Sequence, residues 1–157
     1  MDSSDDLLEL SLQALASCID IRGELRWVEL ASGTSSQIRI RRLPDALALF
    51  VHEAFGGRIT RRVRTGGYDL VISGEHADSL VQHVLPYLTI VKDWFSLYHA
   101  ARQAIVDMRM RSGTTRVSPA EKEWRREVQV EFDLLKAETI VARGRAGVRQ
   151  ANWGSRG

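Results

Sequence analysis

The sequence predicts an α+β fold, in which an antiparallel sheet carries helices on one of its faces. Three observations lead to this prediction. Segments with helical apolar periodicity alternate with short strand-like segments along the N-terminal half. The strand-like segments come in two pairs, each joined by a turn rich in glycine and small polar residues. Each pair follows one helix and precedes another, so the order is α-β-β-α-β-β-α, and two long helices then follow.

The first helix is predicted over residues 5–20. Acidic residues open it, which suits the positive end of the helix dipole. An apolar stripe at spacings of four, three and four residues runs along it: Leu8, Leu12, Leu15 and Ile19. Gly23 ends the helix, and two strands are predicted over residues 24–31 and 37–43, with a turn-rich loop between them.

The second half of the unit begins at Pro44, whose fixed backbone angle suits the first turn of a helix. Gly56-Gly57 ends that helix. A hairpin over residues 58–64 and 68–73 follows, and then a helix over residues 75–85. Basic and aliphatic side chains alternate along both hairpins: Ile38 and Ile40 against Arg39 and Arg41, and Ile59 and Val63 against Arg58, Thr60, Arg62 and Arg64. One sheet face is therefore expected to be apolar and the other basic.

Two long helices are predicted after this unit. The first covers residues 89–110, and the second begins at Ser118-Pro119-Ala120-Glu121, a capping box with proline in the first turn. We expect residues 1–112 to form one domain and residues 113–142 to add a C-terminal helix. Residues 143–157, rich in glycine and arginine, are expected to be a basic tail that is mobile or ordered by a partner.

Charge is unevenly distributed along the chain. The formal net charge is only +2, but residues 38–64 hold seven arginines against two acidic residues, Asp45 and Glu53. Such a local excess is typical of a surface that binds a polyanion. A solvated basic face without a ligand is the alternative.

Composition excludes several classes of protein. The single cysteine, Cys18, cannot form an intramolecular disulfide, and cysteines and histidines are not spaced as zinc ligands. The sequence shows neither a secretory signal nor an apolar run long enough to span a bilayer. We therefore expect a soluble intracellular protein, in the cytoplasm, the nucleoid or an organelle, without a membrane partner.

One segment, Leu15-Ala16-Ser17-Cys18-Ile19-Asp20-Ile21-Arg22-Gly23, closes the first helix and leads into the first strand. It resembles the signature motif of the LAGLIDADG homing endonucleases. Phe55-Gly56-Gly57-Arg58-Ile59 is similar to the family's turn from helix into third strand, and Leu85-Pro86-Tyr87-Leu88 precedes a long helix with Lys92. The resemblance covers roughly residues 7–102 and implies a LAGLIDADG-like fold with a saddle-shaped sheet.

The resemblance also implies partners. Signature helices of this family pack side by side at a dimer or pseudo-dimer axis, which here predicts a homodimer with an interface at Leu12, Ala16 and Ser17. The paired sheets would then lie in the major groove of duplex DNA, with arginines reading base edges and phosphates. The residues expected to bind nucleic acid are Arg39, Arg41, Arg58, Arg62 and Arg64 on the sheet and Arg22 at its centre, where a guanidinium can bind a phosphate.

The catalytic position departs from the family pattern. The acidic residue that binds divalent metals in the family is replaced by Arg22, which cannot bind Mg²⁺. Asp20 stands at the motif's earlier acidic position, where capping or orienting the helix end is the expected role. The position at which the family has a basic residue is occupied by Val91 here. Lys92 follows one residue later, and a step of one residue turns a side chain by about 100° around a helix, so Lys92 points in another direction. Asp20, Glu24 and Lys92 are the remaining catalytic candidates, and Asp20 and Glu24 the candidate metal ligands.

These observations together predict a protein that binds duplex DNA sequence-specifically and in which the ability to cleave DNA is lost or impaired. Such a protein would be a pseudoenzyme without a cofactor. An active homing endonuclease, with Mg²⁺ bound by Glu24 or Asp20, is one alternative. A protein that binds RNA and assists splicing, or that acts as a scaffold, is another, because the extra helices and the basic tail suit a structured partner.

Overall fold

The computed structural model describes residues 3–30, 33–114 and 116–154, and the side chains of residues 3–27, 36–114 and 116–147. Its elements are α1 (Ser3–Arg22), β1 (Gly23–Leu30), β2 (Gly33–Leu43), α2 (Asp45–Phe55), β3 (Arg58–Arg61), β4 (Tyr68–Ser73), α3 (Gly74–Val84), the 3-10 helix η1 (Leu85–Tyr87), α4 (Lys92–Ser112) and α5 (Pro119–Gly154). The predicted α+β class and element order are confirmed. No helix in the described part of the chain has the length and apolarity needed to cross a membrane.

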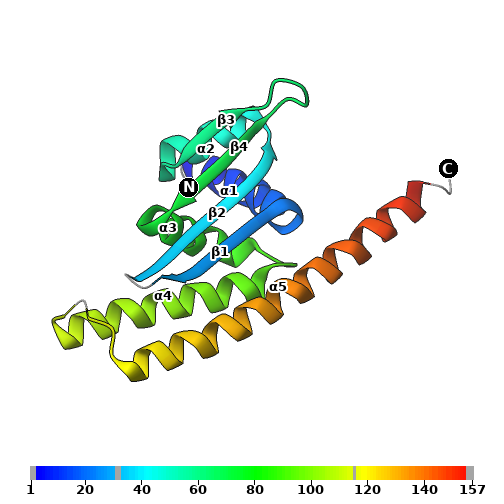
Figure 1. The fold of residues 1–157 in the computed structure, drawn as a ribbon. Helices are drawn as coiled ribbons and strands as arrows, with labels where there is room; N and C mark the ends of the chain where they lie inside the picture. Colours follow the sequence, from blue (N-terminus) through cyan, green and yellow to red (C-terminus); the bar gives the residue numbers. More distant parts are fainter. Residues whose placement is uncertain (1–2, 31–32, 115, 155–157) are drawn as a thin grey trace.

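The sheet has four antiparallel strands in the order β1-β2-β4-β3. Helices α1, α2 and α3 cover one face, and the other face is turned toward the viewer in Figure 1. The register aligns one side chain from each strand in a row across the sheet: Glu24, Arg39, Val71 and Arg58. The aliphatic residues between them, among them Ile38, Ile40, Leu70 and Ile72, are buried against the helices. The predicted division into an apolar and a basic face is confirmed.

Helix α1 packs on the sheet through its predicted stripe. Leu12, Leu15 and Ile19 are buried, and Ala16 is buried beside them, whereas Leu8 is 44% exposed. The buried stripe therefore begins at Leu12, one turn later than predicted, because the N-terminal part of α1 extends beyond the residues that cover it.

The second hairpin is shorter than predicted, because β3 ends at Arg61 and not at residue 64. The amide of Arg62 donates to the carbonyl of Gly67, at 2.9 Å, and this bond closes a loop that continues into β4. Val63 lies in that loop and is 93% exposed, so its predicted inward direction is wrong. Gly67 has a φ of +77°, and a Cβ there would lie 2.7 Å from the carbonyl oxygen of Leu43, so this turn requires glycine.

Strand β2 contains a bulge that the sequence analysis did not predict. Its register to β4 shifts between Ile40 and Leu43, and Arg42 adopts a φ of 56°, which is uncommon for a residue with a side chain. The amide of Arg42 donates to Oδ1 of Asp69 at 3.2 Å. The bulge breaks the alternation of the strand immediately after Arg41.

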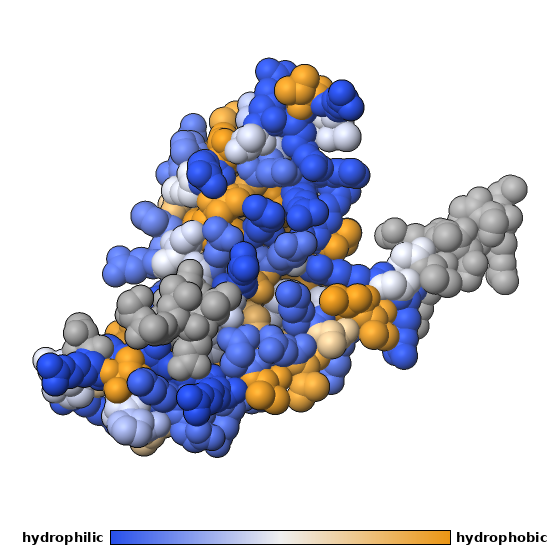
Figure 2. All heavy atoms as spheres, viewed as in Figure 1, coloured by the Kyte–Doolittle hydropathy of each residue, from blue (hydrophilic) through white to orange (hydrophobic). Residues whose placement is uncertain are grey.

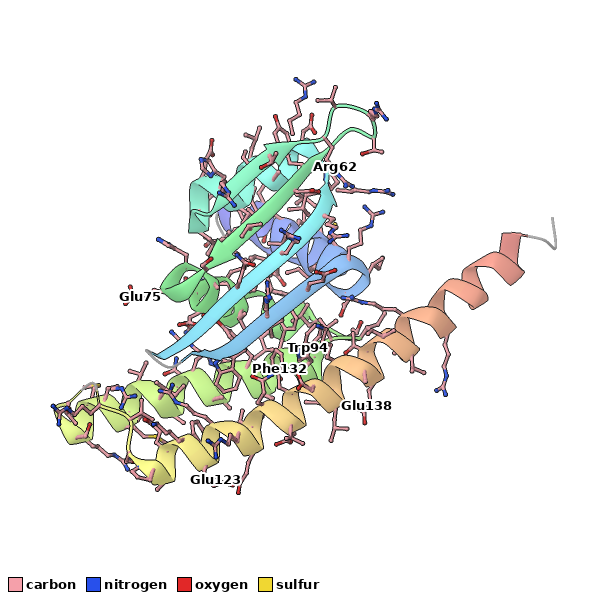
Figure 3. All side chains as sticks on the ribbon, in the orientation of Figure 1. Arg62, Glu75, Trp94, Glu123, Phe132 and Glu138 are labelled. Atoms are coloured by element: carbon pink, nitrogen blue, oxygen red, sulfur yellow. The ribbon has the colours of Figure 1, made fainter. Side chains whose placement is uncertain are left out.

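Helices α4 and α5 form a hairpin that lies along the β1 edge of the sheet (Figure 1). Trp27 of β1, Trp94 of α4 and Phe132 of α5 form the joint: the Phe132 ring centroid lies 6.0 Å from that of Trp27 and 5.6 Å from that of Trp94, both edge to face. Figure 3 shows Trp94 and Phe132 between the two helices. This aromatic cluster connects α5 to the rest of the core.

The start of α5 agrees in part with the predicted capping box. The amide of Glu121 donates to the Ser118 hydroxyl at 3.1 Å, as predicted. The Glu121 carboxylate instead accepts a hydrogen bond from Arg109 of α4, at 3.0 Å. The predicted change from helix to tail at residue 143 is wrong, because α5 continues to Gly154. Arg143 bonds to the body of the domain, and this contact supports the helix beyond that point despite its glycines.

Candidate nucleic-acid interface

The open sheet face gathers four of the predicted arginines. They line a hollow of about 420 Å³, the sheet-face hollow, whose residues are Arg39, Arg41, Arg58, Thr60, Arg62, Asp69 and Val71. The alternation of β2 turns its arginines outward, and β3 and the loop after it supply the others. Hydrophilic side chains dominate this face in Figure 2, with apolar residues between them. Arg64 is exposed in the loop between β3 and β4 and does not line the hollow.

One carboxylate holds one arginine of this hollow in place. Nε of Arg62 lies 3.3 Å from Oδ1 of Asp69, and both side chains are about one third exposed. Asp69 also accepts the amide of Arg42, so it holds the bulge and orients Arg62 at the same time. Arg39, Arg41 and Arg58 are exposed. The hollow therefore presents a net positive surface with one arginine held in place.

A second hollow of about 390 Å³ lies at the C-terminal end of α1. Its lining residues, which define the helix-end hollow, are Ile21, Arg22, Glu24, Arg41, Arg42, Arg62 and Arg143. It shares Arg41 and Arg62 with the sheet-face hollow, so the two adjoin. Nη1 of Arg22 donates to the carbonyl of Arg42 at 3.1 Å, which joins the end of α1 to the bulge of β2.

Arg143 of α5 is bound to the last turn of α1. Its Nε donates to the carbonyl of Asp20 at 2.9 Å, and its Nη2 donates to the carbonyls of Ile19, at 2.9 Å, and Gly23, at 2.6 Å. The carbonyls of Ile19 and Asp20 belong to the last turn of α1, the negative end of the helix dipole, where a cation is stabilising. Burial lowers the pKa of the Arg143 guanidinium, and the nearby Asp20 and Glu24 carboxylates oppose that change.

Asp20 points away from the helix-end hollow into the core. Its carboxylate accepts hydrogen bonds from the Thr89 amide at 3.1 Å to each oxygen, from the Thr89 hydroxyl at 3.0 Å and from the Val91 amide at 3.1 Å. It thus fixes the segment that leads into α4, whereas the prediction was that it caps or orients the end of its own helix. Lys92 is the exposed first residue of α4 and lines neither hollow.

Comparison with known proteins gives matches among solved structures only. No family model and no curated protein matches the sequence. The homing endonuclease I-CvuI in complex with its target is 14% identical at a TM-score of 0.49, over 84% of this chain and 81% of that chain. The homing endonuclease I-TnaI is 16% identical at a TM-score of 0.46, over 84% and 97%.

These solved structures are homing endonucleases, each matched at a TM-score below 0.5. A second I-CvuI complex, with uncleaved I-CreI target DNA in the presence of Mg, matches at 16% identity and a TM-score of 0.46. That match spans 59% of this chain and 65% of the other, which is less than two thirds of its length.

The residues at the position that the motif resemblance assigns to metal binding do not fit a divalent cation. Arg22 replaces the carboxylate, and Arg143 brings a second guanidinium to the same helix end. Both Asp20 oxygens are committed to Thr89 and Val91. Glu24 is the single acid lining the helix-end hollow, whereas hard cations prefer several oxygen ligands. Within the described residues, His, Cys, Asp and Glu form no group of three or more that could hold a metal ion.

Helix α1, which carries the motif, presents a different outer face from the one predicted. Leu12 and Ala16 are covered by the chain's own core, so their side chains cannot line a dimer interface, and that part of the prediction is wrong. The cause is their position on the inward stripe of the helix. Ser17 is exposed and lies on the opposite face, among apolar residues at spacings of three and four: Leu7, Leu10, Ala14 and Ile21.

Two site residues were missed by sequence reasoning. Arg42 belongs to a pair of consecutive arginines in a strand that otherwise alternates, and that break in alternation is the signal of a bulge. Arg143 was assigned to a tail, and nothing local in the sequence places it at the end of α1. Its contacts join residues more than one hundred positions apart, and only tertiary packing determines them.

Proposed function

We propose that this chain binds duplex DNA sequence-specifically through the open face of its sheet and does not cleave it. The observation that carries the proposal is the convergence of Arg39, Arg41, Arg58 and Arg62 in the sheet-face hollow. Arg39 and Arg41 come from β2, Arg58 from β3 and Arg62 from the loop after it, and none of the helices drawn in Figure 1 covers this face of the sheet. A nucleic acid is the ligand class that a basic sheet face of this kind suits best.

The mode of binding follows from the geometry of the strands. A two-stranded β-ribbon fits the major groove, and arginine is the side chain most often paired with guanine there, through two parallel hydrogen bonds. Arg62, oriented by Asp69, suits a specific contact, because less of its side-chain freedom has to be lost on binding. The more exposed Arg39 and Arg58 suit either base edges or phosphates.

The proposed loss of cleavage rests on the charges at the end of α1. Phosphodiester hydrolysis in a metal-dependent nuclease requires a cation that stabilises the attacking and leaving oxygens. Two guanidinium groups occupy the corresponding region here, and the carboxylate retained in the motif is engaged with backbone amides. Binding without cleavage is the function that these residues support.

The proposal includes a homodimer formed through the outer face of α1. Leu7 is 64% exposed, Leu10 61% and Ile21 57%, so α1 is apolar on two opposite faces although only one is covered. Exposed apolar stripes of this kind mark protein contacts. A two-fold pair of chains would place two sheet faces on one duplex and would favour a target with two-fold symmetry.

The test is the salt dependence of binding to a randomised duplex. For the wild type, the logarithm of the affinity should fall steeply with the logarithm of salt concentration, by about 0.9 per phosphate contact. The double variant Arg39→Gln/Arg58→Gln should bind at least tenfold more weakly. The matched control is Arg126→Gln, an arginine of α5 whose side chain is 69% exposed and which lies outside both hollows. Equal loss in the control and in the double variant would contradict the proposal.

A further inference from the structure

The helix-end hollow carries a net positive charge, although one of its arginines, Arg62, is paired with Asp69. Five arginines line it, from α1, β2, the loop after β3 and α5, against the single carboxylate of Glu24. We propose that this hollow is a metal-independent binding site for one backbone phosphate, in which Arg22 and Arg143 supply positive charge at the end of the signature helix. The inference rests on the proposed DNA-binding function and assigns a ligand to a part of it.

The guanidinium groups are anchored yet keep free donors. Arg143 uses Nε and Nη2 on two carbonyls of the last turn of α1 and on the carbonyl of Gly23, and its Nη1 donates to no group within the described residues. Arg22 uses Nη1 on the carbonyl of Arg42 and keeps Nε and Nη2. A guanidinium fixed at one edge and free at the other is suited to bind a phosphate oxygen without much loss of side-chain entropy.

The backbone of β2 is distorted at this hollow. Strand alternation would turn Arg41 and Arg42 to opposite faces, but the bulge places both in the lining. The distortion places Arg42 at a φ of 56°, a conformation that costs free energy for a residue with a side chain. Asp69 holds the Arg42 amide and Arg22 holds its carbonyl, so two contacts maintain the strained geometry.

The position of the hollow favours a backbone phosphate over other anions. It adjoins the sheet-face hollow and shares Arg41 and Arg62 with it, so a duplex bound on the sheet would bring phosphates to its opening. A purely structural role, in which Arg143 only neutralises the helix end, explains the Arg143 contacts. It does not explain why Arg22, Arg41 and Arg42 face the same space.

The experiment follows the side-chain Nε–H NMR signals of the arginines while inorganic phosphate is added to the full-length protein at low ionic strength. The signals of Arg22 and Arg143 should shift and saturate. Arg22→Gln should weaken this binding about tenfold. Arg126→Gln, an exposed arginine of α5 outside the hollow, should leave it unchanged. A Mg²⁺ titration should leave the Arg22 and Arg143 signals unshifted.

Three results would overturn the inference: equal, non-saturating shifts of all exposed arginines, unchanged phosphate affinity in Arg22→Gln, or a saturable response to Mg²⁺. Duplex binding measured on the same samples separates this inference from the proposed function. Duplex binding without a saturable phosphate response would remove the phosphate site and leave the DNA-binding proposal standing. A saturable phosphate response without duplex binding would remove the DNA-binding proposal and leave an anion site of another use.

Discussion

Replacing Asp20 by asparagine should destabilise the fold, because Asp20 connects the signature helix to the segment before α4. The carboxylate is buried, and it accepts four hydrogen bonds between 3.0 and 3.1 Å from the Thr89 amide, the Thr89 hydroxyl and the Val91 amide. Asparagine keeps the shape of the side chain, but it offers one acceptor oxygen and turns an NH₂ group toward a backbone donor.

The expected loss of stability can be estimated from these contacts. Hydrogen bonds to a charged acceptor contribute about 1.5–3 kcal/mol each, and a buried donor left without a partner costs about 1–3 kcal/mol. The substitution removes one carboxylate oxygen, and some of the donors that bonded to it can shift to the remaining oxygen. We therefore expect the free energy of unfolding to fall by about 3 kcal/mol. For a protein of this size, that loss corresponds to a fall of about 6–12 °C in the melting temperature.

The measurement is thermal and urea unfolding of Asp20→Asn beside Glu24→Gln, which makes the same chemical change at an exposed position of the same segment. Glu24→Gln should stay within about 0.5 kcal/mol of the wild type. Asp20→Asn with wild-type stability would refute the structural role. Asp20 would then again be a candidate for catalysis.

Three further predictions concern the core, the C-terminal helix and the dimer. Burial, together with the hydrogen bond to Asp78, raises the pKa of Tyr98, so the folded state keeps a proton that the unfolded state loses above about pH 10. The free energy of unfolding should therefore fall above that pH by up to about 1.4 kcal/mol per pH unit. Urea unfolding measured between pH 8 and 11 should show this fall for the wild type, and the Tyr98→Phe variant should show a smaller fall. Phe132→Ala should lower the free energy of unfolding by about 3–5 kcal/mol and detach α5 from the core. Hydrogen exchange along α5 measures this detachment, and full protection of its amides in the variant would contradict the role of the aromatic cluster. Leu10→Glu should give a folded monomer in sedimentation equilibrium, whereas Val63→Glu on the exposed loop should leave the dimer intact; a dimer in Leu10→Glu would exclude the outer face of α1 as the interface.

Local rules predicted most of the fold. Periodic stripes located the helices, and glycines and proline located their ends, because these signals depend on neighbouring residues alone. The strand after Gly57 was predicted too long, because the loop bond between Arg62 and Gly67 overrides the alternation that continues to Val63. The last helix was predicted too short, because Gly144 and Gly147 weaken its local signal while Arg143 fixes it from a distance.

The candidate site was predicted less completely than the fold. Alternation in β2 identified Arg39 and Arg41, and the motif identified Arg22 as the residue at the metal position. The bulge that turns Arg42 into the helix-end hollow and the contact that brings Arg143 there are tertiary features. A single sequence predicts which residues share a face, but it does not predict which distant segment will complete a site.

The central claim is binding of duplex DNA without cleavage, and the most direct test is selection from a randomised duplex pool followed by incubation of the selected duplexes with the protein and Mg²⁺. The account predicts enrichment of a two-fold-symmetric sequence that stays intact. Cleavage of the enriched sequence would show that Arg22 and Arg143 do not prevent metal-dependent chemistry. Absence of enrichment would contradict the proposal that the sheet face binds duplex DNA sequence-specifically.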